Sequence, residues 1–113
     1  MSIVHDGIDI PSFEERWDRN DKRFINMAWD NILDGRTIIT STWYVPTGWT
    51  KGTEQTSQSV TDDDGNSYTA VNRVYLSTIH VRGSHLITNR VVLSGASPGE
   101  TLERSVYIHV GQL

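Results

Sequence analysis

Histidines and clustered carboxylates are the side chains of this sequence that could most directly support catalysis or metal binding. The four histidines lie on separate segments and lack the i, i+4 spacing that places two metal ligands on one face of a helix: His5, His80, His85 and His109. No G-x-S-x-G nucleophile motif, phosphate-binding loop or dinucleotide fingerprint occurs. We therefore expect no catalytic residue, no cofactor and no metal site, and we interpret each histidine as a surface residue.

An acidic run, Asp62-Asp63-Asp64-Gly65-Asn66, carries the oxygen ligands and the glycine bend that calcium loops use. It departs from the D-x-[DN]-x-[DN]-G-x5-E pattern because no glutamate stands at the closing position. Asp30 and Asp34 flank a turn, where capping accounts for them better than acid–base catalysis does. A chain this short also has little depth for a cleft that holds two catalytic carboxylates. The sequence predicts a solvated hairpin turn at residues 62–66 and a protein that is not an enzyme.

Aromatic residues are the remaining candidates for a binding site, because tryptophan and tyrosine bring large contact areas and few rotatable bonds to protein interfaces. The aromatic residues that a single core need not bury are Trp17, Trp49, Tyr44 and Tyr107. The expected protein-binding residues are Phe13, Trp17, Trp49 and Tyr68. Two alternatives stay open at this point. The aromatic rings can instead cover sheet faces under loops, or exposed tryptophans can form a carbohydrate-binding surface.

The overall composition excludes several classes of protein. With 113 residues and no cysteine, the chain fits a single domain that folds without disulfides or a cysteine-ligated zinc. The net charge is -4 and the basic residues are scattered, which argues against a nucleic-acid partner. No segment approaches the ~20 apolar residues of a membrane span, and the first residues do not form a signal peptide. We expect a soluble protein that is made in the cytoplasm and does not contact a membrane.

The clearest strand covers residues 37–45, where β-branched and aromatic side chains fill nearly every position and alternate between two faces. Ile39, Trp43 and Val45 fall on one of these faces. We place Trp43 at the centre of the core, because a large buried aromatic side chain removes some 150 to 250 Å² from water.

Four further strands are expected over residues 22–29, 68–77, 85–93 and 101–110, with turn-forming residues between them. Residues 50–67 are polar and are expected to be mostly loop, with a modest edge strand over 56–61. The predicted core consists of Trp29, Ile39, Trp43, Val45, Leu76, Val106 and Ile108. Six or seven short strands without a strong amphipathic helix favour an all-β, immunoglobulin-like antiparallel β-sandwich.

Residues 1–21 lack a sustained strand pattern, so we expect an extended N-terminal arm before a sandwich domain of residues 22–113. Phe13 and Trp17 could share one face of a short helix that begins near Ser12. A helix of about two turns is marginal on its own in water. The segment is therefore either a frayed terminus or an arm whose aromatic side chains dock on a neighbouring subunit.

Six short pieces of the sequence occur in an order that is typical of one protein family. They are Trp29-Asp30, residues 33–38 (LDGRTI), residues 41–48 (STWYVPTG), residues 74–77 (VYLS), residues 88–91 (TNRV) and residues 103–110 (ERSVYIHV). Over Lys22 to Val110 the chain resembles small virion structural proteins of tailed bacteriophages. It departs from that pattern at Ala28-Trp29-Asp30, where a D-W-S triplet is usual, and at Thr78-Ile79-His80, which replaces a glycine-rich turn.

The resemblance implies an immunoglobulin-like domain that is carried on the phage particle in many copies, without enzymatic activity and without a cofactor. Its partners would be other virion proteins of the neck, tail, fibre or capsid, together with copies of itself. We favour a neck/tail or fibre adaptor, with a head decoration (cement) protein as the alternative. The expected location is the virion, after synthesis in the host cytoplasm. Because the matching residues are mostly core and turn positions, no binding site transfers with the resemblance.

Overall fold

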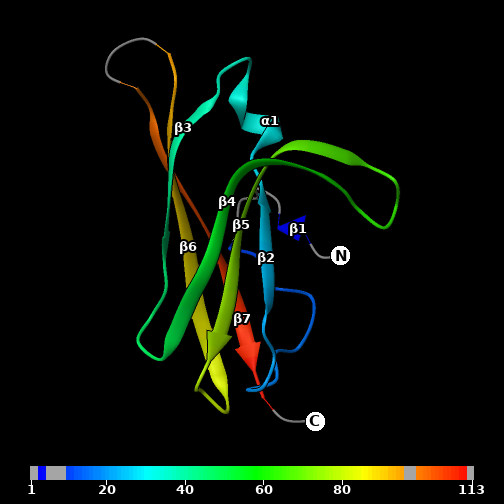
Figure 1. The fold of residues 1–113 in the computed structure, drawn as a ribbon, viewed down its shortest axis with the longest axis vertical. Coiled ribbons are helices and arrows are strands. Elements are labelled where there is room, and N and C mark those ends of the chain that lie inside the picture. Colours follow the sequence, from blue (N-terminus) through cyan, green and yellow to red (C-terminus); the bar gives the residue numbers. More distant parts are fainter. Residues whose placement is uncertain (1–2, 5–9, 96–98, 112–113) are drawn as a thin grey trace.

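The computed structural model describes residues 3–4, 10–95 and 99–111, and these form a sandwich of two β-sheets (Figure 1). One sheet has the order β1-β2-β5-β4, with strands Ile3–Val4, Arg23–Ala28, Ser67–Thr78 and Trp49–Thr61. The other has the order β3-β6-β7, with strands Ile38–Tyr44, Gly83–Leu93 and Thr101–Val110. Neighbouring strands are antiparallel except for the short β1, which runs parallel to β2. The predicted all-β, antiparallel sandwich is confirmed.

A single turn of helix, α1 (Asp30–Leu33), connects β2 to β3. It ends because Asp34 and Gly35 both adopt positive φ angles, of 48° and 80°, in the left-handed region that stops a helix. Within the described part of the chain, no helix has the length and apolar character needed to cross a membrane.

The core lies between the two sheets, because alternate side chains of each strand point inward. Five predicted core residues are fully buried there and are confirmed: Trp29, Trp43, Leu76, Val106 and Ile108. Along β6 the inward residues are Ile87, Val91 and Leu93, whereas Leu86 on the same strand points outward.

Ile39 was expected in the core, but the structure shows that this prediction is wrong, since the side chain is 61% exposed. Ile38 pairs with Leu93 and Thr40 pairs with Val92, so Ile39 is an extra residue in a β-bulge. The bulge shifts the alternation by one position and turns Ile38 toward the core. Val45 lies one residue beyond the end of β3 and only partly buries its side chain against the core edge.

Residues 50–61 form most of the 13-residue strand β4, so the expected loop with a short edge strand is wrong. The strand pairs with β5 along its length, and its register shifts at three places. One irregularity includes Ser57, whose φ is 54° and whose backbone N–H donates to Asn72 Oδ1 at 3.1 Å. These bulges let an edge strand of polar residues curl, and backbone pairing rather than side-chain hydrophobicity holds it in place.

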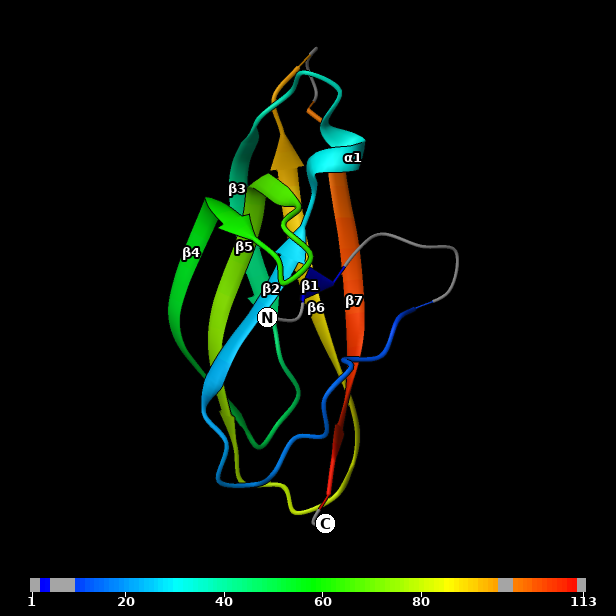
Figure 2. The same cartoon turned by 90° about the vertical axis from the view of Figure 1, so that its right-hand side faces the viewer.

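The N-terminal segment packs along the outer edge of β7 and does not form the predicted free arm with a helix near Ser12 (Figure 2). Ser12 and Trp17 form isolated parallel bridges with Tyr107 and Val110. The backbone N–H of Phe13 donates to Tyr107 O at 2.8 Å, and that of Trp17 donates to His109 O at 3.0 Å. Residues 11–17 thus cover a sheet edge that would otherwise expose unpaired backbone groups.

Candidate docking surfaces

The outer face of the three-stranded sheet carries large apolar side chains that no element of the described chain covers. Tyr44 on β3, Leu86 on β6 and Tyr107 on β7 are 47%, 38% and 37% exposed. Tyr107 is directly opposite Leu86, and Tyr44 is opposite Thr88 in the next outward-facing row. We call this surface, defined by Tyr44, Leu86 and Tyr107, the apolar face.

A charged pair borders the apolar face. Arg90 Nε donates to Glu103 Oε2 at 3.0 Å, and the Arg90 guanidinium carbon lies 5.7 Å from the centroid of the Tyr44 ring. Together with Thr88 these residues line a shallow hollow of about 350 Å³. An exposed ion pair contributes little to stability. Its place beside apolar rings instead gives the polar rim around an apolar centre that protein interfaces have.

The β3–β4 and β5–β6 loops and the end of β7 meet at one end of the sandwich, at the bottom of Figure 1. We call this region the loop end. The β5–β6 turn presents Ile79 and Val81, of which Ile79 is 79% exposed. Aliphatic side chains at the tip of a turn do not pack into the core of the domain. The loop end is therefore a second candidate contact surface.

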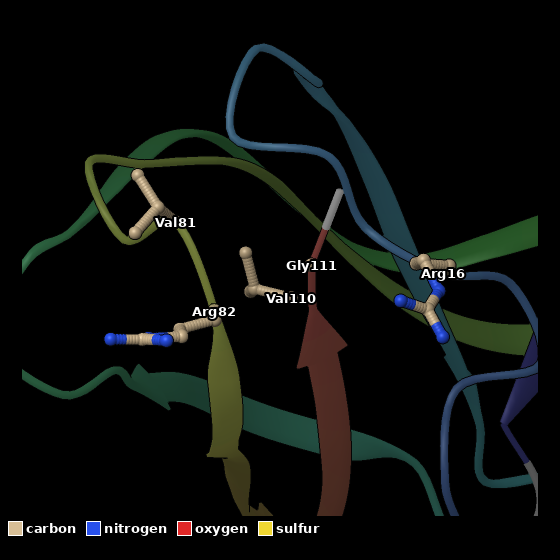
Figure 3. Close-up of a pocket in the computed structure, with 5 residues that line it drawn as sticks. All are labelled: Arg16, Val81, Arg82, Val110 and Gly111. Carbon is tan, nitrogen blue, oxygen red and sulfur yellow. The ribbon is translucent and has the colours of Figure 1, made fainter. Parts of the chain in front are cut away.

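A hollow of about 570 Å³ opens at the loop end, lined by Arg16, Val81, Arg82, Val110 and Gly111 (Figure 3). We call it the basic hollow. Figure 3 shows Val110 and Gly111 between Arg16 and Arg82, with Val81 on the side of Arg82. Neither guanidinium forms an ion pair with any residue that the structure describes. A Cβ on Gly111 would lie 2.9 Å from Arg16 Nη1, so glycine leaves the room that this guanidinium occupies.

Two of the histidines meet at the loop end, although their sequence positions gave no sign of it. The rings of His80 and His85 stack with centroids 4.2 Å apart, and His85 meets the edge of Trp49 at 5.7 Å. His80 Nε2 lies 2.8 Å from the carbonyl oxygen of Thr47, so it carries the proton and donates it. This cluster fixes the two loops against each other. His109 lies apart and bonds to Ser12 and Ser84.

Within the described ranges, no group of three or more histidine, aspartate or glutamate side chains converges in a way that could hold a metal ion. His5 lies outside the described residues. Residues 62–66 form a turn in which Asp62 Oδ1 accepts hydrogen bonds from the backbone N–H groups of Asp64 and Asn66, at 3.0 and 2.9 Å. These bonds, the backbone bond from Asn66 first, hold the pKa of the Asp62 carboxyl below its usual value. The carboxylate therefore organises the turn itself.

Three of the four residues expected to bind a partner lie together, but inside the molecule. Phe13, Trp17 and Trp49 are buried in one cluster, with ring centroids 6.0 Å apart for the first two and 5.5 Å apart for the two tryptophans. The Arg23 guanidinium covers Trp17 at 4.7 Å. The prediction that these three side chains are exposed for docking is therefore wrong. Tyr68 is partly buried against a smaller cluster, and its hydroxyl lies 3.4 Å from Asp62 Oδ2.

The sequence pointed to Tyr44 and Tyr107 of the apolar face, and both are exposed in the structure, but it did not single out the other exposed residues of the two surfaces. Alternation along the strand predicted over residues 85–93 puts Leu86 on the side opposite Ile87, as the structure shows, but the sequence does not indicate that this side is uncovered. Ile79 and Val81 fell in an expected turn. One sequence signal does point to the loop end. Aliphatic residues occupy positions in this turn where turn-forming residues are usual.

No family model matches the chain, and no curated protein matches it. Among solved structures, the cysteine protease inhibitor EhICP2 from Entamoeba histolytica is similar in fold, with a TM-score of 0.52. The alignment covers 96% of this chain and 93% of that chain at 13% sequence identity. This likeness supports the all-β sandwich. The neighbour is an inhibitor and not an enzyme, and at this identity the comparison bears on the fold alone.

Proposed function

We propose that this chain is a non-enzymatic structural protein of a bacteriophage virion, and that it acts as a neck/tail or fibre adaptor. The observation that carries the proposal is the apolar face, where Tyr44, Leu86 and Tyr107 stand exposed on the flat side of a rigid sandwich. The sequence resemblance over residues 22–110 supports the same role. In this role the sandwich is a stiff body that holds other virion proteins at a fixed spacing.

The size of the molecule makes both surfaces necessary for stable incorporation. The accessible surface is 6600 Å², so an obligate interface, which takes about 1,000 Å² or more from each partner, needs roughly a seventh of it. One face of a three-stranded sheet offers less than this. Because β6 runs from Gly83 at the loop end to Leu86 on the apolar face, the two surfaces adjoin and can supply the area together.

A role without catalysis agrees with the chemistry of the hollows. In the hollow beside the apolar face, the carboxylate of Glu103 is already paired with Arg90. The basic hollow is lined by two arginines, two valines and a glycine, none of which is a general acid or base near neutral pH. Neither hollow combines a nucleophile with a base within hydrogen-bonding reach.

The carbohydrate-binding alternative loses the feature that favoured it. It required exposed tryptophans, whereas all four tryptophans of the chain are buried. EhICP2 is named as an inhibitor of cysteine proteases. A similarity in fold at 13% sequence identity is no evidence that this chain binds a protease. Head decoration remains the second candidate, because a cement protein needs the same rigid body and the same apolar face.

Deletion of the gene in the phage that encodes this chain tests the proposal. Purified wild-type particles should contain the protein by mass spectrometry, and particles made without it should have filled heads that lack tails or fibres. Tailed particles that lack only head stability would favour the decoration protein. Complete and stable particles without the protein would overturn the structural role altogether.

A further inference from the structure

The loop end and the β4–β5 hairpin differ in the charge that they present. At the loop end, Arg16 and Arg82 have no ion-pair partner among the described residues. Of the nearby carboxylates, Glu15 and Asp21 are both occupied by Arg23, at 2.6 and 2.9 Å. Within the described part of the chain, the basic hollow therefore has two guanidinium groups that form no ion pair, although the chain as a whole carries -4.

The opposite part of the molecule presents an acidic tip. The β4–β5 hairpin projects from the side of the sandwich, away from the loop end (Figure 1). Its turn contains Asp62, Asp63 and Asp64, and the side chains of Asp63 and Asp64 are exposed. Asp62 holds the turn in shape through its bonds to two backbone N–H groups. A preformed turn loses little conformational entropy when it docks.

We propose that the basic hollow of one copy binds the β4–β5 hairpin tip of a second copy. Arg16 and Arg82 both line the hollow together with the apolar side chains of Val81 and Val110, so a turn that carries carboxylates meets one guanidinium from the N-terminal segment and one from the β5–β6 loop. Gly65 follows the aspartates and has no neighbouring atom within 4 Å of where its Cβ would stand, so the tip is slim as well as acidic.

This contact joins two different surfaces of the same chain, so it is heterologous. Repetition of a heterologous contact generates a ring when the rotation closes and a filament when it does not. The inference rests on the proposed function for its purpose, which is assembly of many copies in one particle. Its test needs only the purified protein.

Nucleic acid fits the basic hollow less well than a second copy does. Binding to a phosphate backbone uses a row of several cations, whereas only two arginines line this hollow. Two carboxylates on a small protruding turn need only two cations.

Two charge-reversed variants test the contact. Arg16→Glu/Arg82→Glu gives a copy with an acidic hollow and an acidic tip, and Asp63→Lys/Asp64→Lys gives a copy with a basic hollow and a basic tip. Neither variant can join head to tail with itself. In an equimolar mixture, however, every tip meets a hollow of opposite charge. Arg16→Lys/Arg82→Lys is the matched control, because it keeps both positive charges.

Sedimentation velocity at protein concentrations up to about 1 mM measures the association, since a Kd of that order still gives detectable complexes. We expect the wild type and the lysine control to associate in about 50 mM salt and to dissociate in about 0.5 M salt. Each charge-reversed variant alone should associate about tenfold more weakly or not at all, and the mixture should recover. Circular dichroism checks that each variant is folded.

Three results would overturn the inference: a wild type that stays monomeric, charge-reversed variants that associate as well as the wild type, or a mixture that does not recover. Failure of this test leaves the gene-deletion experiment unaffected. Likewise, complete particles without the protein would overturn the virion role and leave a measured self-association standing.

Discussion

The indole N–H of Trp29 donates a 2.9 Å hydrogen bond to Asn89 Oδ1, which lies 60 residues away in the sequence and on the opposite sheet. The same oxygen accepts a bond from Asn72 Nδ2 at 2.8 Å, and Asn89 Nδ2 donates to Ser41 Oγ at 2.9 Å. Asn72 in turn accepts from the backbone of Ser57 in the bulged part of β4. A small buried polar network thus ties both sheets and the curled edge strand to one amide side chain.

Replacement of Asn89 by leucine should lower the free energy of unfolding by about 2 to 4 kcal/mol. The substitution removes the acceptor of the Trp29 indole N–H and of one N–H of Asn72 Nδ2, and each unsatisfied buried group costs about 1–3 kcal/mol. Urea unfolding followed by tryptophan fluorescence measures the change. Thr40→Ala, at an exposed position of β3, is the control and should have little effect. An unchanged urea midpoint for Asn89→Leu would show that the network does not stabilise the fold.

Trp17→Ala should destabilise the protein by about 3–5 kcal/mol, which is most of the stability of a typical small domain. The side chain is 0% exposed and packs between Phe13, Trp49 and the Arg23 guanidinium. Thermal unfolding by circular dichroism measures the loss. If Trp17 instead belonged to an arm that docks on another subunit, the isolated variant would melt at the same temperature as the wild type.

The strands that the sequence predicted best are those whose side chains alternate without interruption. The last strand was placed at residues 101–110 with both ends correct, and Val106 and Ile108 face the core as expected. The alternation failed at Ile39, because a bulge depends on how the partner strand is paired and leaves no mark in the sequence around it.

Two other features depend on parts of the chain that are distant in the sequence. β4 is polar along most of its length, so only the neighbouring β5 backbone makes it a strand. The burial of Phe13 and Trp17 requires the open edge of β7, which is about ninety residues away. In an extended segment, residues four apart also point the same way, so the spacing of these two aromatics fits a strand-like segment as well as a helix. For the same reason the sequence pointed to Tyr44 and Tyr107 as surface aromatics together with the buried Trp17 and Trp49, because the exposure of a side chain depends on which distant segments cover it.

The proposed virion role predicts that Leu86→Glu/Tyr107→Glu leaves the protein folded and prevents its incorporation into particles. Both side chains lie on the apolar face and point away from the core, so charge there costs little in the free protein but is expensive when buried at an interface. Quantitative mass spectrometry of purified particles should show about a tenfold drop or more in copy number. Thr56→Glu, on the exposed edge strand of the other sheet, is the control and should be incorporated normally. Equal incorporation of the two variants would mean that the apolar face makes no contact in the particle.

Acid should loosen the β4–β5 hairpin through Asp62. Hydrogen bonds from the backbone N–H groups of Asn66 and Asp64 lower the pKa of its carboxyl in the folded state. A lowered folded-state pKa means that the stabilising contribution is present above the ordinary pKa of about 3.9 and is lost as the pH falls through the folded value. Carbon-detected NMR should find the Asp62 carboxyl titrating below the ordinary value for aspartate. In Asp62→Asn this acid-dependent change in the hairpin amides should disappear, and a normal pKa for Asp62 would refute the assignment.

Gly48→Ala should disturb the loop end for two reasons that can be measured separately. Gly48 has a φ of 94°, and a Cβ there would lie 2.4 Å from His80 Nε2. Gly65 has a φ of 87° and no atom within 4 Å of an added Cβ, so its replacement by alanine introduces backbone strain but no steric clash. We expect about 1–2 kcal/mol of destabilisation for Gly65→Ala from the left-handed conformation alone. Gly48→Ala should lose a further 1–3 kcal/mol or so from overpacking against the histidine ring.

A double-mutant cycle isolates the contact between Gly48 and His80. In the His80→Ala background the clash is removed, so Gly48→Ala should then cost about as much as Gly65→Ala does, a coupling of about 1 kcal/mol or more. Urea unfolding of the four proteins gives the coupling energy. Additive effects would show that His80 does not lie over Gly48. The stacked pair of His80 and His85 would then not hold the β3–β4 and β5–β6 loops together, and the loop end would lack the fixed shape that a docking surface needs.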